Sequence, residues 1–144
     1  MICEHRGYEI DDARARMDFT VVHGWLTTSY WSPGISRDMV ERGAENSAMV
    51  VGAYHDGVQV GYMRVISDTT RFAYICDVFV DDTHRGKGIA KAMVHFALMH
   101  PLFKGMQRWL LSTRDAHEVY STVGFYPLPE PERWMIRSAP SENS

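Results

Sequence analysis

The chain has 144 residues and a hydrophobic content of 45%, which fits one folded domain with its own core and excludes a mainly disordered chain. Its formal net charge of −3 does not supply the positive field on which most nucleic-acid-binding proteins depend. The two cysteines, Cys3 and Cys76, have the spacing of neither a disulfide framework nor a zinc site, which suits a reducing compartment.

Membrane, export and metal signals are missing from the sequence pattern. No apolar run is long enough to span a membrane, and the first residues lack the pattern of a secretory signal. The seven histidines show no metal-ligand spacing. We therefore expect a cytoplasmic protein that binds no metal, no nucleic acid and no membrane.

The first third of the chain combines one short strand with two helices. Alternating polar and apolar residues predict a strand over residues 8–11. Apolar residues at helical spacing predict a helix over 19–30 with Asp18 as its cap. Ser36 is expected to cap a second helix, which runs to Glu45.

A meander of three strands follows. Residues 49–54 and 58–66 read as strands joined by a turn that contains Asp56-Gly57, a pair that tolerates the positive φ angles of a type I′ turn. The third run, residues 72–80, is apolar on both faces. We expect this strand to lie centrally in the sheet, covered on both sides.

The last part of the chain predicts a parallel unit. A loop over 81–88 precedes a helix over 89–99, and a strand at 109–111 completes a right-handed crossover. The remaining elements are expected to be a helix over 112–123 that Gly124 ends, a Pro-spaced segment over 127–131 and a last strand around 134–136.

These elements predict an α+β fold class (mixed α/β). One mixed central sheet joins an antiparallel meander to a parallel βαβ unit, with helices on both faces. Residues 1–137 are expected to form a single domain, and the polar residues 138–144 a flexible tail.

The loop before the 89–99 helix has the character of an anion site. Its residues Arg85-Gly86-Lys87-Gly88-Ile89-Ala90 place two glycines and two cations where a helix N-terminus offers free N–H groups. A Walker A loop would need Ser or Thr after Gly-Lys, and the Rossmann fingerprint would need Gly where Lys91 stands. A cofactor that carries a diphosphate fits best, with a plain basic surface turn as the alternative.

Two motifs resemble those of the GCN5-related N-acetyltransferase (GNAT) family, in its small stand-alone prokaryotic type. Arg85-x-x-Gly88-x-Ala90 resembles the acetyl-CoA signature of that family. Ala116 before Tyr120, followed by Gly124-Phe125, resembles its second marker, about thirty residues further on. The predicted element order is also similar to the GNAT fold over the whole chain except the tail. His84 and Thr113 depart from the family, which often has Tyr and Asn there.

The resemblance implies an acetyl-CoA-dependent N-acetyltransferase. The acceptor would be a primary amine of a small molecule or an exposed protein amine, attacking directly in a ternary complex. In the family a bulge splays the central strand from its parallel neighbour, and the pantetheine arm lies in the gap. The cofactor-binding residues implied for this chain are Val78, Phe79, Val80, Arg85, Gly86, Lys87, Gly88, Ile89, Ala90 and Thr113.

The candidate catalytic and acceptor-binding residues come partly from the family resemblance and partly from the character of single residues. The resemblance makes Tyr120 the general acid, because a phenol is protonated at neutral pH and can give its proton to a departing thiolate. Asp77, an acid inside an apolar strand, is either the base that takes the amine proton or a bridged structural acid. Tyr30 and Trp31 lie in a loop suited to contact the substrate.

Two questions stay open at this point. The same fold without turnover would be a non-catalytic CoA-binding sensor or an interaction domain, and the retained Tyr120 favours the enzyme. The sequence predicts either a monomer or a homodimer.

Overall fold

The computed structural model describes residues 1–140, which form one six-stranded sheet with the strands in chain order. Neighbouring strands are antiparallel except for the last two, which run parallel. The strands are β1 (Ile2–His5), β2 (Tyr8–Asp11), β3 (Met49–His55), β4 (Val58–Ser67), β5 (Phe72–Val80) and β6 (Arg108–Leu111). The predicted mixed sheet, a meander joined to a parallel unit, is confirmed.

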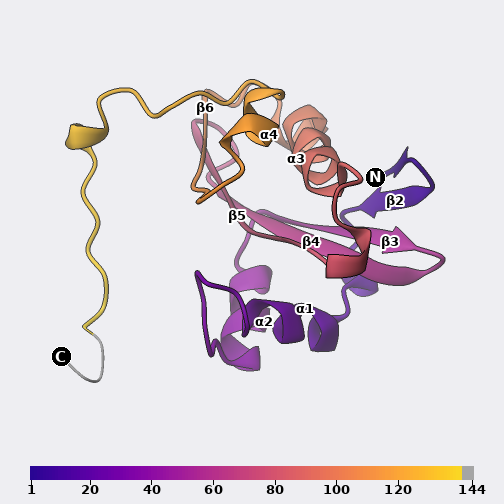
Figure 1. The fold of residues 1–144 in the computed structure, drawn as a ribbon. Helices are drawn as coiled ribbons and strands as arrows, with labels where there is room; N and C mark the ends of the chain where they lie inside the picture. Colours follow the sequence, from indigo (N-terminus) through magenta and orange to yellow (C-terminus); the bar gives the residue numbers. More distant parts are fainter. Residues whose placement is uncertain (141–144) are drawn as a thin grey trace.

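Helices cover both faces of this sheet (Figure 1). On one face α1 (Phe19–Leu26) and α2 (Arg37–Glu45) pack over buried side chains such as Tyr62. On the other face α3 (Ile89–Met99) and the short α4 (His117–Ser121) cover the larger core, which includes Met63. Within residues 1–140 there are also four 3-10 turns: Arg14–Arg16, Asp82–His84, Pro101–Phe103 and Pro131–Arg133.

Local signals in the sequence fix several boundaries. The Asp18 carboxylate accepts a hydrogen bond from the Val21 N–H at 3.3 Å, and the Ser36 hydroxyl accepts one from the Met39 N–H at 3.2 Å. These are the two predicted helix caps. Asp56 and Gly57 have φ angles of 49° and 79°, as the predicted turn between β3 and β4 requires.

Strand β1 is absent from the sequence prediction. Its four residues pair with β2 through a turn at Arg6-Gly7, where both φ angles are positive. Most of β1 is exposed, so its sequence lacks the alternation that reveals a half-buried strand. Only the neighbouring edge of β2 makes these residues a strand.

The end of the chain also differs from the prediction. Helix α4 covers residues 117–121 rather than 112–123, because the Thr113 hydroxyl accepts the Ala116 N–H at 3.0 Å and holds the preceding residues as a loop. The predicted strand at 134–136 is wrong, since these residues have no regular structure. Of the predicted tail, residues 138–140 are exposed, and 141–144 lie outside the described residues.

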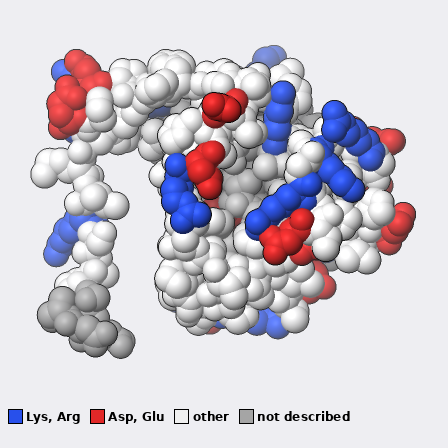
Figure 2. Space-filling model, in the orientation of Figure 1, with Lys and Arg blue, Asp and Glu red and all other residues white. Residues whose placement is uncertain are grey.

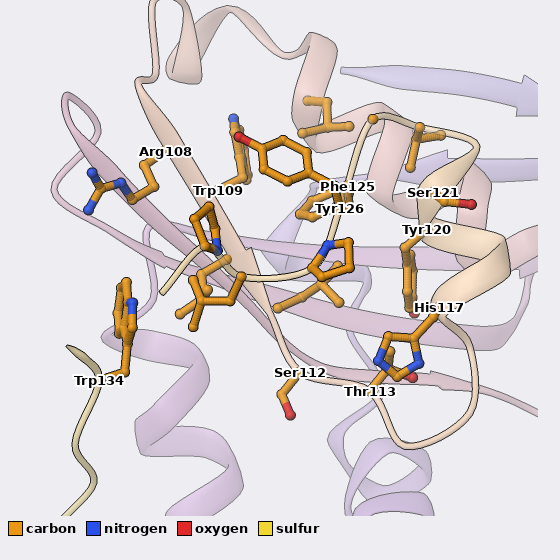
Figure 3. Close-up of a pocket in the computed structure, with 18 of the residues that line it drawn as sticks. Arg108, Trp109, Ser112, Thr113, His117, Tyr120, Ser121, Phe125, Tyr126 and Trp134 are labelled. Atoms are coloured by element: carbon orange, nitrogen blue, oxygen red, sulfur yellow. The ribbon is translucent and has the colours of Figure 1, made fainter. Parts of the chain in front are cut away.

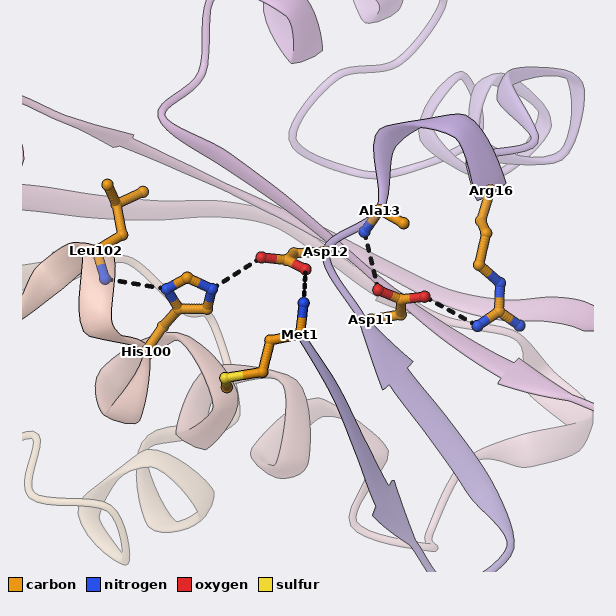
Figure 4. A network of polar contacts seen from close by, with 7 residues as sticks. All are labelled: Met1, Asp11, Asp12, Ala13, Arg16, His100 and Leu102. Carbon is orange, nitrogen blue, oxygen red and sulfur yellow. Dashed lines mark hydrogen bonds and ion pairs between the residues drawn. The ribbon is translucent and has the colours of Figure 1, made fainter.

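A polar cluster closes the β1 edge of the sheet (Figure 4). The Met1 ammonium and the His100 Nε2 each lie 2.8 Å from the Asp12 carboxylate, and the His100 Nδ1 accepts the Leu102 N–H. Burial alone would raise the pKa of Asp12, but hydrogen bonds from the ammonium and from His100 lower it below its ordinary value. The cluster ties the sheet edge to the end of α3.

None of the helices within residues 1–140 is both long and apolar enough to cross a bilayer. The same residues contain no group of His, Cys, Asp and Glu side chains arranged to hold a metal ion.

Candidate active site

The site begins with a bulge in β5. Tyr62 pairs with Phe79 and Arg64 with Cys76, so two residues of β5, Asp77 and Val78, lie opposite a single residue of β4. Asp77 has φ of 58°, in the left-handed region that Asp tolerates better than most residues. A bulge of this kind bends the strand and ends its regular pairing.

The two parallel strands separate just before the bulge. Their last paired residues are Ile75 and Leu111, and β6 ends there while β5 continues to Val80. Residues 76–80 therefore have a strand neighbour only on the β4 side, and they are half-buried. This corrects the expectation of a central strand covered on both sides: β5 is second from the sheet edge, and its far end borders a gap.

The loop after β5 presents free backbone donors. Gly86 and Gly88 have φ angles of 77° and 75°, and Gly88 is the N-cap of α3. Within residues 1–140, the N–H groups of residues 86–91 have no hydrogen-bond partner, and the first one used is that of Ala92, which donates to the Gly88 carbonyl at 2.9 Å. Such a run of N–H groups at a helix N-terminus is suited to hold an anion.

Side chains from the first hairpin support this loop. The His5 Nε2–H donates to the Lys87 carbonyl at 2.9 Å, and a hydrogen bond of 2.8 Å joins the Tyr8 hydroxyl to the His84 Nδ1. On the inner side, Arg85 donates to the Val80 carbonyl at 3.0 Å. Sequence reasoning missed His5 and Tyr8, because neither lies near the loop along the chain.

A cavity of about 630 Å³ joins the free end of β5, the loop and the start of α3. Among the predicted cofactor-binding residues, its walls include Val78, Phe79, Val80, Arg85, Gly86, Gly88, Ile89 and Ala90, together with Tyr30, Trp31 and Tyr120. Lys87, Thr113 and Asp77 do not line it. Figure 2 shows acidic and basic side chains around a hollow on this face.

Tyr120 projects from α4 to the boundary of this cavity. Its side chain is 7% exposed, and its hydroxyl makes no hydrogen bond within residues 1–140. Burial, followed by the neighbouring Tyr30 and Asp115, raises the pKa of Tyr120 above its ordinary value of 10.0. The phenol therefore keeps its proton at neutral pH and has that proton free to give.

Aromatic side chains form the opposite wall. Trp25 stacks on Phe79 with ring centroids 5.4 Å apart, and Trp31 meets Tyr30 edge-on at 4.9 Å. The Arg114 guanidinium lies 4.0 Å from the centre of the Tyr30 ring. The predicted contacts Tyr30 and Trp31 line the cavity together with Arg114, which the sequence did not single out, and Trp25 supports Phe79 without lining the cavity.

Asp77 lies behind this wall with both carboxylate oxygens engaged. The Trp31 indole N–H donates to Oδ1 at 3.0 Å, and the Arg64 Nε–H donates to Oδ2 at 2.7 Å. The Arg64 and Asp77 side chains are 22% and 10% exposed, so the pair is shielded from water. Asp77 thereby links the bulge to the orientation of Trp31.

A second hollow, of about 1260 Å³, lies on the other side of Tyr120 (Figure 3). It is bounded by β6, α4 and the chain that leaves α4, and it includes Thr113 and His117. Tyr120 belongs to the walls of both hollows. Thr113, predicted to bind the cofactor, lines this second hollow, and its hydroxyl accepts the N–H of Ala116, the residue before α4.

Comparison with known proteins decides the family. The sequence model of the acetyltransferase (GNAT) family matches residues 9–125. The chain belongs to the GNAT acetyltransferase family. Its predicted GNAT fold is confirmed as well, because a crystal structure from Xanthomonas campestris pv. campestris, assigned to this family, superposes with a TM-score of 0.88 at 35% identity and covers 95% of this chain and 96% of that one.

Two more distant structures share the fold. A GNAT family protein from Streptococcus pneumoniae has a TM-score of 0.68 at 18% identity and covers 99% of each chain. A GNAT family acetyltransferase from Elizabethkingia anophelis, solved with acetyl-CoA bound, has a TM-score of 0.65 at 12% identity and covers 84% of this chain and 77% of that one. No curated protein matches the sequence. The GNAT family uses acetyl-CoA to acetylate amine acceptors, and this defines the chemistry to test against the site.

Proposed function

We propose that this GNAT protein is an N-acetyltransferase that moves the acetyl group of acetyl-CoA to a primary amine, of a small molecule or exposed on a protein, by direct attack in a ternary complex. The observation that carries the proposal is one cavity that contains both an unpartnered run of N–H groups and the wall residue Tyr120. The first feature suits a diphosphate, and the second suits a leaving thiolate.

The residues present fit the coenzyme. The N–H groups of residues 86–91 and the Arg85 side chain at the cavity wall would hold its diphosphate. The gap that opens beyond Ile75 leaves one edge of β5 free to pair with the amide groups of the pantetheine arm. Loop and gap are adjacent, so a single extended ligand can contact both.

Acetyl transfer would need only a few groups of this chain. Acetyl-CoA supplies a thioester whose carbonyl carbon accepts the amine nitrogen, so that a C–N bond forms while the C–S bond breaks. A backbone N–H near Phe79 or Val80, beyond the bulge, would stabilise the oxygen that becomes negative. Tyr120 would give its phenol proton to the departing sulfur, and its raised pKa keeps that proton available.

Asp77 was expected to be either the base or a bridged structural acid. Its two hydrogen-bonded oxygens favour the second role, in which it holds Trp31 at the acceptor side. Proton loss from the amine would then pass to water. Asp77→Asn separates the two roles. If Asp77 is the base, the acid limb of the kcat/KM pH profile should be lost in the variant. If Asp77 positions Trp31, the variant should have a raised KM and an unchanged pH profile.

The acceptor side has its own chemistry. Tyr30 and Trp31 present exposed aromatic surface beside the cavity, and Asp115 adds a carboxylate. Arg114 already lies over the Tyr30 ring and 3.9 Å from the Asp115 carboxylate, so the Trp31 ring is the aromatic face left to attract a cationic amine. This favours small amines with an apolar or aromatic body among the acceptors to be screened.

The test is release of free thiol from acetyl-CoA with a panel of amines, together with calorimetric binding of acetyl-CoA. We expect binding without any amine and thiol release with at least one acceptor. Tight binding without release for any acceptor would favour a CoA-binding sensor. Absence of binding at millimolar acetyl-CoA would favour an interaction domain and refute the proposal.

A further inference from the structure

The sheet ends in two edge strands, β1 and β6, and β6 is the apolar one that borders a hollow. This strand is the last in the sheet order and pairs only with β5. Its apolar residues Trp109, Leu110 and Leu111 are only half-buried. Proteins usually cover or block such an edge, because its free N–H and C=O groups are ready to pair with another strand.

An apolar segment of the same chain lies uncovered elsewhere. After α4 the chain leaves the sheet and runs away from it (Figure 1). Trp134, Met135 and Ile136 follow one another there, with exposed fractions of 42%, 97% and 90%. Three successive large apolar side chains in water are a strong sign of a surface that is buried in another state of the molecule.

The connection between edge and segment is stiff. Pro127, Pro129 and Pro131 fix three φ angles within five residues, and such spacing keeps a chain extended. Between them, Glu130 has φ of 51°, a left-handed conformation that is costly for a residue with a Cβ. The chain beyond Trp134 is therefore held away from its own β6, while Trp134 itself borders the hollow beside that strand.

The space beside β6 is large enough for a strand. The second hollow, of about 1260 Å³, is lined by Trp109 and Leu111 of β6 and by Phe125 and Trp134 of the chain that leaves α4. Figure 3 shows Trp109, Phe125 and Trp134 around it. Neighbouring strands lie about 4.8 Å apart, and four residues of β6 are available to pair. An apolar strand would both pair the open edge and fill this hollow.

We propose that two copies of this chain exchange their C-terminal segments, so that residues 133–137 of one copy add a strand to β6 of the other. Each copy has one open edge and one uncovered segment, so a twofold arrangement satisfies both in both copies. Trp134 and Ile136 would share one face of the added strand, as the period of two requires, and Met135 would face the opposite side. The sequence pattern that predicted a strand at 134–136 is then fulfilled in the dimer.

The test is the mass of the full chain in solution, measured by light scattering or sedimentation. We expect a species of twice the 16.5 kDa chain mass. Met135→Asp should weaken the dimer about a hundredfold, because it places a carboxylate on one face of the added strand, where pairing with β6 would remove it from water. Met99→Asp is the matched control: Met99 is 67% exposed at the end of α3, and its replacement should leave the mass unchanged.

Hydrogen exchange distinguishes exchange of segments from other dimers. In the wild-type protein, amides of residues 108–111 and 133–137 should exchange at least ten times more slowly than in Met135→Asp. A monomeric wild-type protein overturns the proposal, and a monomer in which residues 133–137 are protected shows that the segment pairs with its own β6. A dimer that Met135→Asp leaves intact overturns it as well.

Discussion

The two edges of the sheet are built differently. From β2 to β4 every strand has an antiparallel partner on both sides, and inward residues such as Ile10 and Val51 are at most 1% exposed. Both end strands, β1 and β6, have a single neighbour, but only on the β6 side does a pairing break off within the sheet, where β5 loses its parallel partner after Ile75. The closed edge supplies packing, whereas the open edge supplies unpaired backbone and cavities. Changes at the first should therefore affect stability, and changes at the second activity or binding.

The largest expected effect lies at the closed edge. Ile10→Ala removes most of a fully buried side chain between the sheet and α3, and should lower the free energy of unfolding by about 2–5 kcal/mol. Urea denaturation measures this loss. Ile2→Ala is the control, because Ile2 is 57% exposed. A fall in kcat for folded Ile10→Ala, measured at low temperature, would show that the two edges are not separable.

At the open edge, Tyr120→Phe removes only the phenol oxygen. We expect kcat to fall about a hundredfold, equivalent to about 2.7 kcal/mol of barrier, because the leaving sulfur loses its proton donor. The unfolding free energy should change by less than about 1 kcal/mol, since the hydroxyl has no hydrogen-bond partner within residues 1–140.

The pH dependence of kcat and a control variant at Tyr126 test the role of Tyr120 further. The raised pKa of Tyr120 predicts a decline of kcat only above pH 10, and this decline should disappear in Tyr120→Phe. Tyr126→Phe, at a tyrosine that is 76% exposed, should leave kcat unchanged. If both variants turn over at the wild-type rate, Tyr120 is a packing residue.

The bulge in β5 contains the ion pair between Arg64 and Asp77. Asp77→Asn keeps a residue that tolerates positive φ but leaves the half-buried Arg64 without its carboxylate, and should cost about 1–2 kcal/mol of stability. Asp38→Asn breaks an ion pair of similar length, 2.8 Å, on the exposed face of α2, and should cost less than about 0.5 kcal/mol. Equal costs in thermal unfolding would contradict a buried role for Asp77.

The phosphate loop can be tested with two matched glycines. Gly86 and Gly105 have φ angles of 77° and 79°, and an added Cβ would meet no atom within 4 Å at either. Gly86→Ala should weaken acetyl-CoA binding about tenfold, or about 1.4 kcal/mol, because its methyl group occupies space beside the free N–H groups. Gly105→Ala should lose similar stability from backbone strain but bind normally in calorimetry.

The smallest effect concerns the polar cluster at the closed edge. Because the pKa of Asp12 is lower in the folded state, its contribution to stability is present above the ordinary value of 3.8 and is lost as pH falls through the folded value. Asp12→Asn should therefore cost less than about 1 kcal/mol at neutral pH. Below the lowered folded-state pKa of Asp12, the stability curve of Asp12→Asn should meet that of the wild-type protein. A difference that persists in acid would point to packing rather than charge.

Features that depend on neighbours along the chain were predictable. The caps Asp18 and Ser36 and the turn at Asp56-Gly57 each act within four residues, so their chemistry is visible in the sequence. The loop before α3 is equally local, because two glycines, two cations and the helix start lie within six residues. Those same residues carried the family resemblance that the comparisons confirmed.

Features that depend on distant partners were decided only by the tertiary structure. Asp77 reads as an isolated acid until folding brings Arg64 and Trp31 to it, and β1 becomes a strand only beside β2. The strand predicted at 134–136 has no partner strand among residues 1–140, because the prolines before it direct the chain away from the sheet. Local conformational preference therefore determined the turns, the caps and the anion loop. Which long-range pairs exist, and which edge stays open, was determined by how the packed elements meet in space.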